Sequence, residues 1–233
     1  MNADGQLNIG AIIFPDIDQM DFTGPFEVLT RLPNAAFHIL WKDKIPVRDM
    51  RGLILTPEKT FSEAPQLDVL VVPGGYGQEA LMDDETVLSF IRKQAVQAKY
   101  VMSVCTGALT CGAAGLLRGR RATTNWTVFH LLEYFGATPV KERVVVDGNF
   151  VSTAGVSAGI DGALLMAAML RGPRAAEQIQ LYIEYAPEPP FRSGEPDKAP
   201  PEVLEAARQA GRPMAELRLA TAKRISQRLG LGS

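Results

Sequence analysis

The sequence predicts an α/β fold: a three-layer sandwich in which a mostly parallel sheet lies between two layers of helices. The first observation is that short apolar runs alternate with stretches whose apolar residues recur at helical spacing. The second is that each run is apolar throughout, which is typical of strands buried on both faces. The third is that the run 100–104 stops at Cys105, where a helical pattern of small residues follows at once. Such a strand-to-helix turn resembles a nucleophile elbow, which holds a reactive side chain above the sheet.

The first half of the chain predicts strands and helices in alternation. Strands are expected at 7–14, 37–41 and 67–72, and helices at 18–32 and 84–98. The strands 7–14 and 67–72 are expected to end at residues 15–16 and 73–75, because proline and glycine interrupt regular structure. Residues 42–60 predict turns and short extended pieces, with a hairpin turn at Arg51-Gly52.

The second half continues from the elbow. Helices are expected at 108–117, 128–135, 157–170 and 174–185, and extended segments at 143–146 and 150–153. The Asp147-Gly148 pair between the two extended segments is a strong hairpin signal. Residues 186–201 are expected to form a proline-rich linker, and residues 202–229 a helical tail that is interrupted near 211–213.

The domain organisation follows from this order. We expect an α/β domain over residues 1–190, then a linker and C-terminal helical extension over 191–233, packed on the same domain or on a dimer partner. The basic residues of the extension outnumber its acids and are Arg208, Arg212, Arg218, Lys223, Arg224 and Arg228. A basic surplus on a short helix usually marks a solvated or dimer-facing surface, and the tail is too short for a two-motif DNA-binding domain.

Composition argues against several classes of protein. The net charge of −2 and the pI near 5.8 give no reason to expect nucleic acid as a partner. The first five residues lack the regions of a signal peptide, and the apolar stretch 162–170 is too short to span a bilayer. Cys105 and Cys111 make no disulfide framework, and neither His38 nor His130 has the neighbours of a metal site. We therefore expect a cytoplasmic enzyme without a metal.

Three strand ends are expected to meet at the carboxyl edge of the sheet, where ligands bind in such folds. They are residues 15–21, the pair Gly74-Gly75, and Cys105. Amides without a partner at the helix start, together with the helix dipole, favour an anion, so we expect a lowered pKa for the Cys105 thiol. The alternative is a small buried hydrophobe, which is what we expect of Cys111.

Asp21 and Thr106 are the candidates for proton transfer and for assistance beside the thiol. Asp21 lies among apolar residues, which would desolvate its carboxyl group and raise its pKa toward a range useful for catalysis. Its alternatives are a helix N-cap or a surface acid. Asp16 and Asp18 alternate with Ile17, which favours solvent exposure for both. The Thr106 hydroxyl has two possible roles, orienting a water or the substrate, or capping the helix.

Backbone groups are expected to complete the site. The amides of Gly74 and Gly75, with that of Thr106, would form an oxyanion-type pocket for the substrate. The alternative is a tight turn that needs positive φ. Val156, which follows the small residues 154–155, is expected to line the substrate site where the chain can move, and its alternative is a well-packed helix start.

Four motifs occur together in this chain: Asp21-Phe22-Thr23-Gly24-Pro25, Pro73-Gly74-Gly75, Ser103-Val104-Cys105-Thr106-Gly107 and Ala122-Thr123-Thr124. Their combination resembles the ThiJ/PfpI superfamily, and the resemblance extends over residues 7–229. Within the superfamily the chain is most similar to the isocyanide hydratase group. The further matches to that group are Gln180-Leu181, Glu184-Tyr185-Ala186-Pro187 and Pro189-Pro190-Phe191.

The resemblance implies a flavodoxin-like sandwich, usually a homodimer, that needs no metal or organic cofactor. It implies that Cys105 is the nucleophile, Asp21 the acid/base and Thr106 the assisting residue in hydration of a small-molecule isocyanide to a formamide. Peptidase-like members carry histidine in place of Thr106, and many relatives carry histidine in place of Asn125. Both departures weaken a protease or chaperone-deglycase function. The alternative is a ligand-sensing or redox-sensing protein with an oxidisable cysteine.

Overall fold

The computed structural model describes residues 5–231 and has one seven-stranded sheet at its centre, in the order β10-β11-β7-β6-β1-β2-β5. Its strands are β1 (Leu7–Ile12), β2 (Ala35–Trp41), β5 (Lys59–Thr60), β6 (Val69–Val72), β7 (Tyr100–Val104), β10 (Val144–Asp147) and β11 (Phe150–Thr153). Every neighbouring pair is parallel except β10–β11, the predicted antiparallel hairpin. All of β6 is buried, as expected for a strand covered on both faces. The mostly parallel sheet is confirmed.

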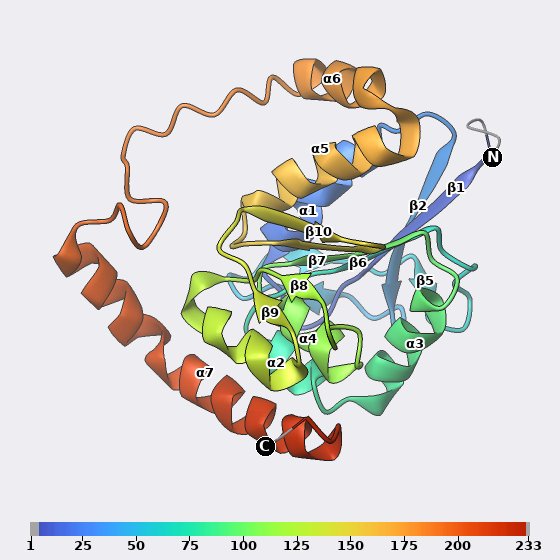
Figure 1. The fold of residues 1–233 in the computed structure, drawn as a ribbon. Helices are drawn as coiled ribbons and strands as arrows, with labels where there is room; N and C mark the ends of the chain where they lie inside the picture. Colours follow the sequence, from blue (N-terminus) through green and yellow to red (C-terminus); the bar gives the residue numbers. More distant parts are fainter. Residues whose placement is uncertain (1–4, 232–233) are drawn as a thin grey trace.

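Helices cover both faces of the sheet, which confirms the three-layer sandwich. Figure 1 shows α1, α5 and α6 above the sheet and α2, α3 and α4 below it. The helices are α1 (Gln19–Leu29), α2 (Gln78–Leu81), α3 (Glu85–Ala95), α4 (Gly107–Ala113), η1 (Trp126–Phe135), α5 (Ala158–Arg171), α6 (Pro173–Tyr182) and α7 (Pro201–Arg228). Two small sheets flank them, the hairpin of β3 (Val47–Arg48) with β4 (Ile54–Leu55) and the parallel pair of β8 (Arg121–Ala122) with β9 (Thr138–Pro139).

Polar side chains at the helix starts explain where several helices begin. Asp18 accepts a hydrogen bond from the Met20 amide at 3.2 Å and caps α1, and Asp84 accepts one from the Val87 amide at 3.3 Å and caps α3. Asn125 caps η1 in the same way, and this segment is a 3₁₀ helix with a kink inside it. Each of these helices is thus bounded by a signal that is local in sequence.

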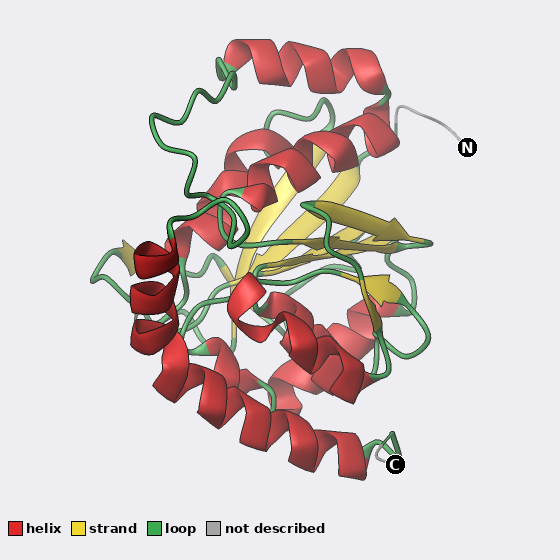
Figure 2. Ribbon diagram, turned by 60° about the vertical axis from the view of Figure 1, so that its left-hand side comes forward, coloured by secondary structure: helices red, strands yellow, loops and turns green. Residues whose placement is uncertain are grey.

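The C-terminal helix differs from the prediction. We expected an interruption near residues 211–213, but α7 is continuous from Pro201 to Arg228 with Pro213 inside it. Proline removes one backbone hydrogen bond, a cost that packing can offset. Here α7 packs along η1, and Gly211 lies against Thr127 beside the proline. Figure 2 shows α7 as one long helix along the outside of the sandwich.

The extension over 191–233 contacts the sandwich at two places. α7 contacts η1, α2 and α4 of its own chain, and Asp197 of the linker pairs with Lys141. Among residues 5–231, no helix combines the length and the apolarity needed to cross a membrane. The prediction about the first five residues falls almost entirely on residues 1–4, which lie outside the described residues.

Candidate active site

The predicted elbow is present, and its backbone is strained. Cys105 joins β7 to α4 with φ of 54°, a left-handed conformation that is uncommon for a residue with a side chain. Its amide donates to the carbonyls of Thr153 at 3.2 Å and Ala154 at 3.0 Å. The Thr124 hydroxyl donates to the Cys105 carbonyl at 2.6 Å. These contacts from the end of β11 and from the loop after β8 hold the cysteine in place at the sheet edge.

Gly107 allows the sharp turn from β7 into α4. A Cβ atom at this position would lie 2.0 Å from the Val72 carbonyl oxygen and 2.8 Å from that of Pro73. Both obstacles are backbone atoms of the neighbouring strand end, so they cannot rotate away. The close approach of α4 to β6 therefore requires glycine at this position.

Asp21 lies in the first turn of α1 and is fully buried. Its Oδ2 accepts a hydrogen bond from the Gly74 amide at 2.9 Å, and the Cys105 thiol lies beside the carboxyl group. Burial raises the Asp21 pKa to about 8, and the charge of Asp18 adds to this shift. The N-cap is Asp18, so the capping alternative for Asp21 is wrong. Asp16 is exposed as expected, but Asp18 is half-buried, because its side chain is turned toward the helix start.

Cys105 is buried, with only 6% of the residue exposed. Burial raises its pKa, and the charge of the Asp21 carboxylate raises it further. Hydrogen bonds from the Val156 and Thr106 amides act in the opposite direction. The expected lowering of the pKa is therefore wrong: amide donors are present, as the helix start predicted, but removal of water from the thiolate outweighs them.

The glycine amides are not free to hold an anion. The Gly74 amide is bonded to Asp21, and the Gly75 amide donates to Thr106 Oγ1 at 3.3 Å. Gly75 has φ of 124°, so the tight-turn alternative describes it well. The amides that point at the sulfur belong to Thr106 and Val156 instead. The Thr106 side chain makes no capping bond, so its capping alternative is wrong.

Arg218 is the residue that the sequence argument placed incorrectly. We expected a solvated or dimer-facing side chain, but Arg218 is only 5% exposed and donates from Nη2 to the Gly75 carbonyl at 2.5 Å. It shares a buried face of α7 with Ala222 and Ile225, one and two turns further along the helix. That helical spacing was the signal in the sequence that could have identified it as buried.

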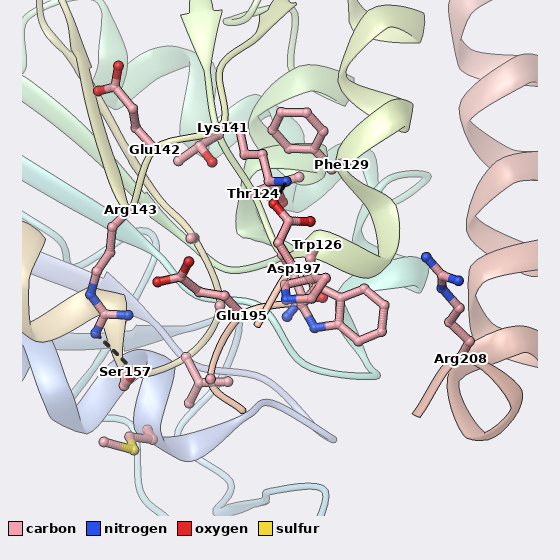
Figure 3. Close-up of a pocket in the computed structure, with 18 residues that line it drawn as sticks. Thr124, Trp126, Phe129, Lys141, Glu142, Arg143, Ser157, Glu195, Asp197 and Arg208 are labelled. Carbon is pink, nitrogen blue, oxygen red and sulfur yellow. Dashed lines mark hydrogen bonds and ion pairs between the residues drawn. The ribbon is translucent and has the colours of Figure 1, made fainter. Parts of the chain in front are cut away.

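A cavity of about 970 Å³ is lined by Thr124, whose hydroxyl bonds the Cys105 carbonyl, but Cys105, Asp21 and Thr106 are not among its lining residues. Val156, which was predicted to line the substrate site, lines this cavity and has φ of 23°, so its backbone is strained. Met20, the neighbour of Asp21, reaches the cavity from α1. Figure 3 shows two aromatic rings in its wall, those of Trp126 and Phe129.

Charged side chains surround the outer part of the cavity, and most are paired. Lys141 pairs with Asp197 of the linker, and Arg143 bonds both Asp161 and Ser157. The lining therefore combines these charged groups with the apolar side chains of Met20, Phe129 and Val156, and one ion pair joins the linker to the cavity wall.

The two histidines and the second cysteine lie away from this chemistry. His38 is buried in β2 and contacts Asn8 and Lys59, whereas His130 is exposed on η1. Cys111 is buried inside α4, and burial alone raises its pKa. Among the described residues, no group of three or more histidine, cysteine, aspartate or glutamate side chains could hold a metal ion.

The fold and the site together define an α/β protein with a cysteine at a nucleophile elbow. The model of the DJ-1/PfpI family matches residues 8–169, and the chain belongs to that family. The resemblance drawn from the four motifs is thus confirmed.

Individual relatives agree with this assignment. The chain is 51% identical over 225 residues to an isonitrile hydratase of Pseudomonas putida, covering 97% of this chain and 99% of that protein. A solved ThiJ/PfpI family protein from Pseudomonas syringae has a TM-score of 0.91 at 39% identity, covering 94% of this chain and 91% of that one. Drosophila melanogaster DJ-1beta has a TM-score of 0.72 at 20% identity, covering 78% of this chain and 100% of that one, and shares the fold.

Proposed function

We propose that this protein is an isocyanide hydratase, a hydro-lyase that converts R–N≡C and water into an N-substituted formamide. The observation that carries the proposal is the Cys105 thiol held at the elbow beside the buried Asp21 carboxyl group. The near full-length identity to an isonitrile hydratase supports it, since isonitrile is another name for isocyanide. The reaction needs one nucleophile and one group that carries protons, and the site offers both.

The first step forms a covalent adduct. In its reactive form the site holds one proton between the Cys105 sulfur and the Asp21 carboxyl group. The thiolate attacks the terminal carbon of the isocyanide, and Asp21 delivers the proton to the same carbon. A C–S bond and a C–H bond form as the C–N triple bond becomes double. The product is a thioimidate, R–N=CH–S–Cys105, beside an ionised Asp21.

The second step hydrolyses the adduct. Asp21 takes a proton from water as the water oxygen attacks the thioimidate carbon, and passes that proton to nitrogen. It then accepts the hydroxyl proton while the C=O bond forms and the C–S bond breaks. The formamide leaves, and the thiolate and protonated Asp21 are restored. The same carboxyl group serves as acid and base, and a pKa of about 8 suits both uses near neutral pH.

The surrounding groups have supporting roles in this proposal. The Thr106 and Val156 amides stabilise negative charge on sulfur, because they point at it from fixed backbone. The Gly74 amide orients the Asp21 carboxyl group, and the Gly75 amide orients the Thr106 hydroxyl. The R group would lie in the cavity beside Val156, among the apolar side chains of its wall. No metal or organic cofactor takes part in any step.

Assembly and location complete the proposal. We infer a homodimer, supported by large exposed apolar side chains on α6 and the linker after it, including Leu181, Tyr182 and Phe191. Light scattering in solution would test it. A cytoplasmic location is supported by the two free cysteines, since thiols persist where the environment is reducing.

The test is formation of formamide from a panel of alkyl and aryl isocyanides. We expect turnover by the wild-type protein and none by Cys105→Ala, because the covalent step needs the sulfur. Cys111→Ala is the matched control and should keep activity within a few-fold. Absence of formamide with every isocyanide would reject the proposal. Reversible oxidation of Cys105 in that case would favour the redox-sensing alternative.

A further inference from the structure

The C-terminal helix places a buried cation at the back of the candidate site. Arg218 Nη2 lies 2.5 Å from the Gly75 carbonyl oxygen and 3.5 Å from Thr106 Oγ1. Its Nε is buried and has no hydrogen-bond partner among the described residues. An arginine so placed is costly unless a negative charge lies nearby.

The structure offers few anions to this guanidinium group. Within the described residues, Arg218 makes no ion pair, whereas Arg224 and Arg228 of the same helix both pair with Asp83. The titratable groups that act on Arg218 are Cys105, Glu79, Tyr76 and Asp21. Glu79 lies on α2 and accepts a hydrogen bond from the Thr221 hydroxyl at 2.6 Å. Of the other groups that act on Arg218, Cys105 and Asp21 are buried and form the reactive pair, and Asp18 lies beyond them.

Arg218 also limits what the Thr106 hydroxyl can do. Thr106 Oγ1 accepts a hydrogen bond from the Gly75 amide at 3.3 Å and lies 3.5 Å from Arg218 Nη2. A hydroxyl oxygen has two lone pairs and one hydrogen. Because the Gly75 amide and Arg218 Nη2 both donate toward this oxygen, the hydroxyl hydrogen is available for donation to another acceptor. A Cβ built on Gly74 would meet both Thr106 Oγ1 and Asp21 Oδ2, so the hydroxyl lies on the same side as the acid.

We propose that Arg218 is a positioning residue of the active site: it supplies the positive charge that allows the Cys105–Asp21 pair to carry one negative charge, and it orients Thr106 as a hydrogen-bond donor. The consequence for turnover rests on the proposed hydratase function. The consequence for the charge state of the thiol does not, because it follows from the burial and contacts of Arg218 alone. The helix that looked like a solvated tail would then be part of the catalytic domain.

The test is the pH dependence of alkylation of Cys105 by iodoacetamide in folded variants of the full chain. Arg218→Met removes the charge at similar length, Arg218→Gln removes it but keeps a donor for the Gly75 carbonyl, and Arg218→Lys keeps the charge. We expect both neutral variants to be alkylated about tenfold more slowly at neutral pH, with the midpoint about one pH unit higher. Arg218→Lys should stay within about threefold of wild type.

Arg224→Met is the matched control, since it removes an exposed arginine of the same helix and its ion pair with Asp83. It should leave the alkylation profile unchanged, although it also weakens the attachment of α7. Circular dichroism and thermal unfolding select the folded variants. A merely structural Arg218 would change the melting temperature but not the pH midpoint of the thiol.

Thr106→Val supplies the second measurement, made both with the native Arg218 and with Arg218→Gln. If Arg218 acts through the hydroxyl, Arg218→Gln should lower isocyanide turnover less in the Thr106→Val background than it does in the wild-type background. Full additivity would overturn the orienting role. An unshifted alkylation midpoint in the neutral variants would overturn the charge role, even if the wild type hydrates isocyanides. A shifted midpoint without turnover would instead reject the proposed function and retain the charge role.

Discussion

The two cysteines of this protein stand six positions apart, on the same strand-to-helix segment, and their surroundings differ. Cys105 has a left-handed backbone, two amide donors at its sulfur, and the Asp21 carboxyl group beside it. Cys111 is fully buried inside α4, and none of these groups is among the causes of its pKa. Burial raises the pKa of both thiols.

This contrast shows that a low resting pKa is not what distinguishes the candidate nucleophile. The distinction is the presence of groups that can stabilise a charge once it forms and accept or return a proton. Cys105 has both kinds of group within contact, and 6% of it is exposed, whereas Cys111 is fully buried. Reactivity is therefore expected to depend on neighbours and access, and each of the following measurements tests one part of that expectation.

The largest effect is expected from removal of the proton carrier. Asp21→Asn should lower isocyanide turnover by about 10²-fold or more, because Asp21 is the carboxyl group that, within the described residues, shares a hydrogen bond with the thiol. Asp18→Asn is the matched control: asparagine is also a good N-cap, so α1 should start normally and turnover should stay within a few-fold. Steady-state kinetics would measure both. Turnover by Asp21→Asn within a few-fold of wild type would remove Asp21 from the mechanism.

A smaller difference is expected in chemical labelling. Iodoacetamide should modify Cys105 at least about tenfold faster than Cys111 at neutral pH, since two amides donate to the Cys105 sulfur and 6% of that residue is exposed, whereas Cys111 is fully buried. Peptide mapping by mass spectrometry after timed quenching would give both rates. Labelling of Cys111→Ala at the wild-type rate is the control. Equal rates at the two positions would contradict the contrast between them.

The third measurement concerns stability and pH. The folded protein holds the Asp21 proton up to about pH 8, whereas the ordinary carboxyl group loses it near 3.8, so wild-type stability should fall as the pH rises through this window. Asp21→Asn should lack that loss and gain stability relative to wild type toward pH 8. Urea unfolding at several pH values would measure it.

Asp83 gives the control of opposite sign. Arg224 lowers its pKa, so its contribution is present above its ordinary pKa and is lost as the pH falls through the folded value. Asp83→Asn should therefore destabilise the protein slightly at neutral pH, and this effect should disappear in acid.

For Asp21, the contradicting outcome is a difference in the free energy of unfolding between wild type and Asp21→Asn that stays constant from about pH 4 to about pH 8. Such a result would show that the Asp21 carboxyl group is not buried as described.

Much of the fold could be predicted because its signals are local. The uniform apolar run of β6 indicated a strand covered on both faces, and Asp147-Gly148 indicated the hairpin of β10 and β11. Cys105 and Asp21 were also identified correctly as neighbours, since the ends of parallel strands meet at one sheet edge. Small residues after a strand predicted the elbow, and the close contact at Gly107 explains why.

The chain alone therefore determined its layers, its elbow and the neighbouring Cys105 and Asp21 side chains, because periodicity and turn residues act over a few positions. Only the tertiary structure decided the charge environment of that pair. Burial of the thiol depends on packing from several elements, and Arg218 meets the Gly75 carbonyl across 143 positions of sequence. Desolvation and long-range contacts are properties of the assembled core, and no local pattern records them.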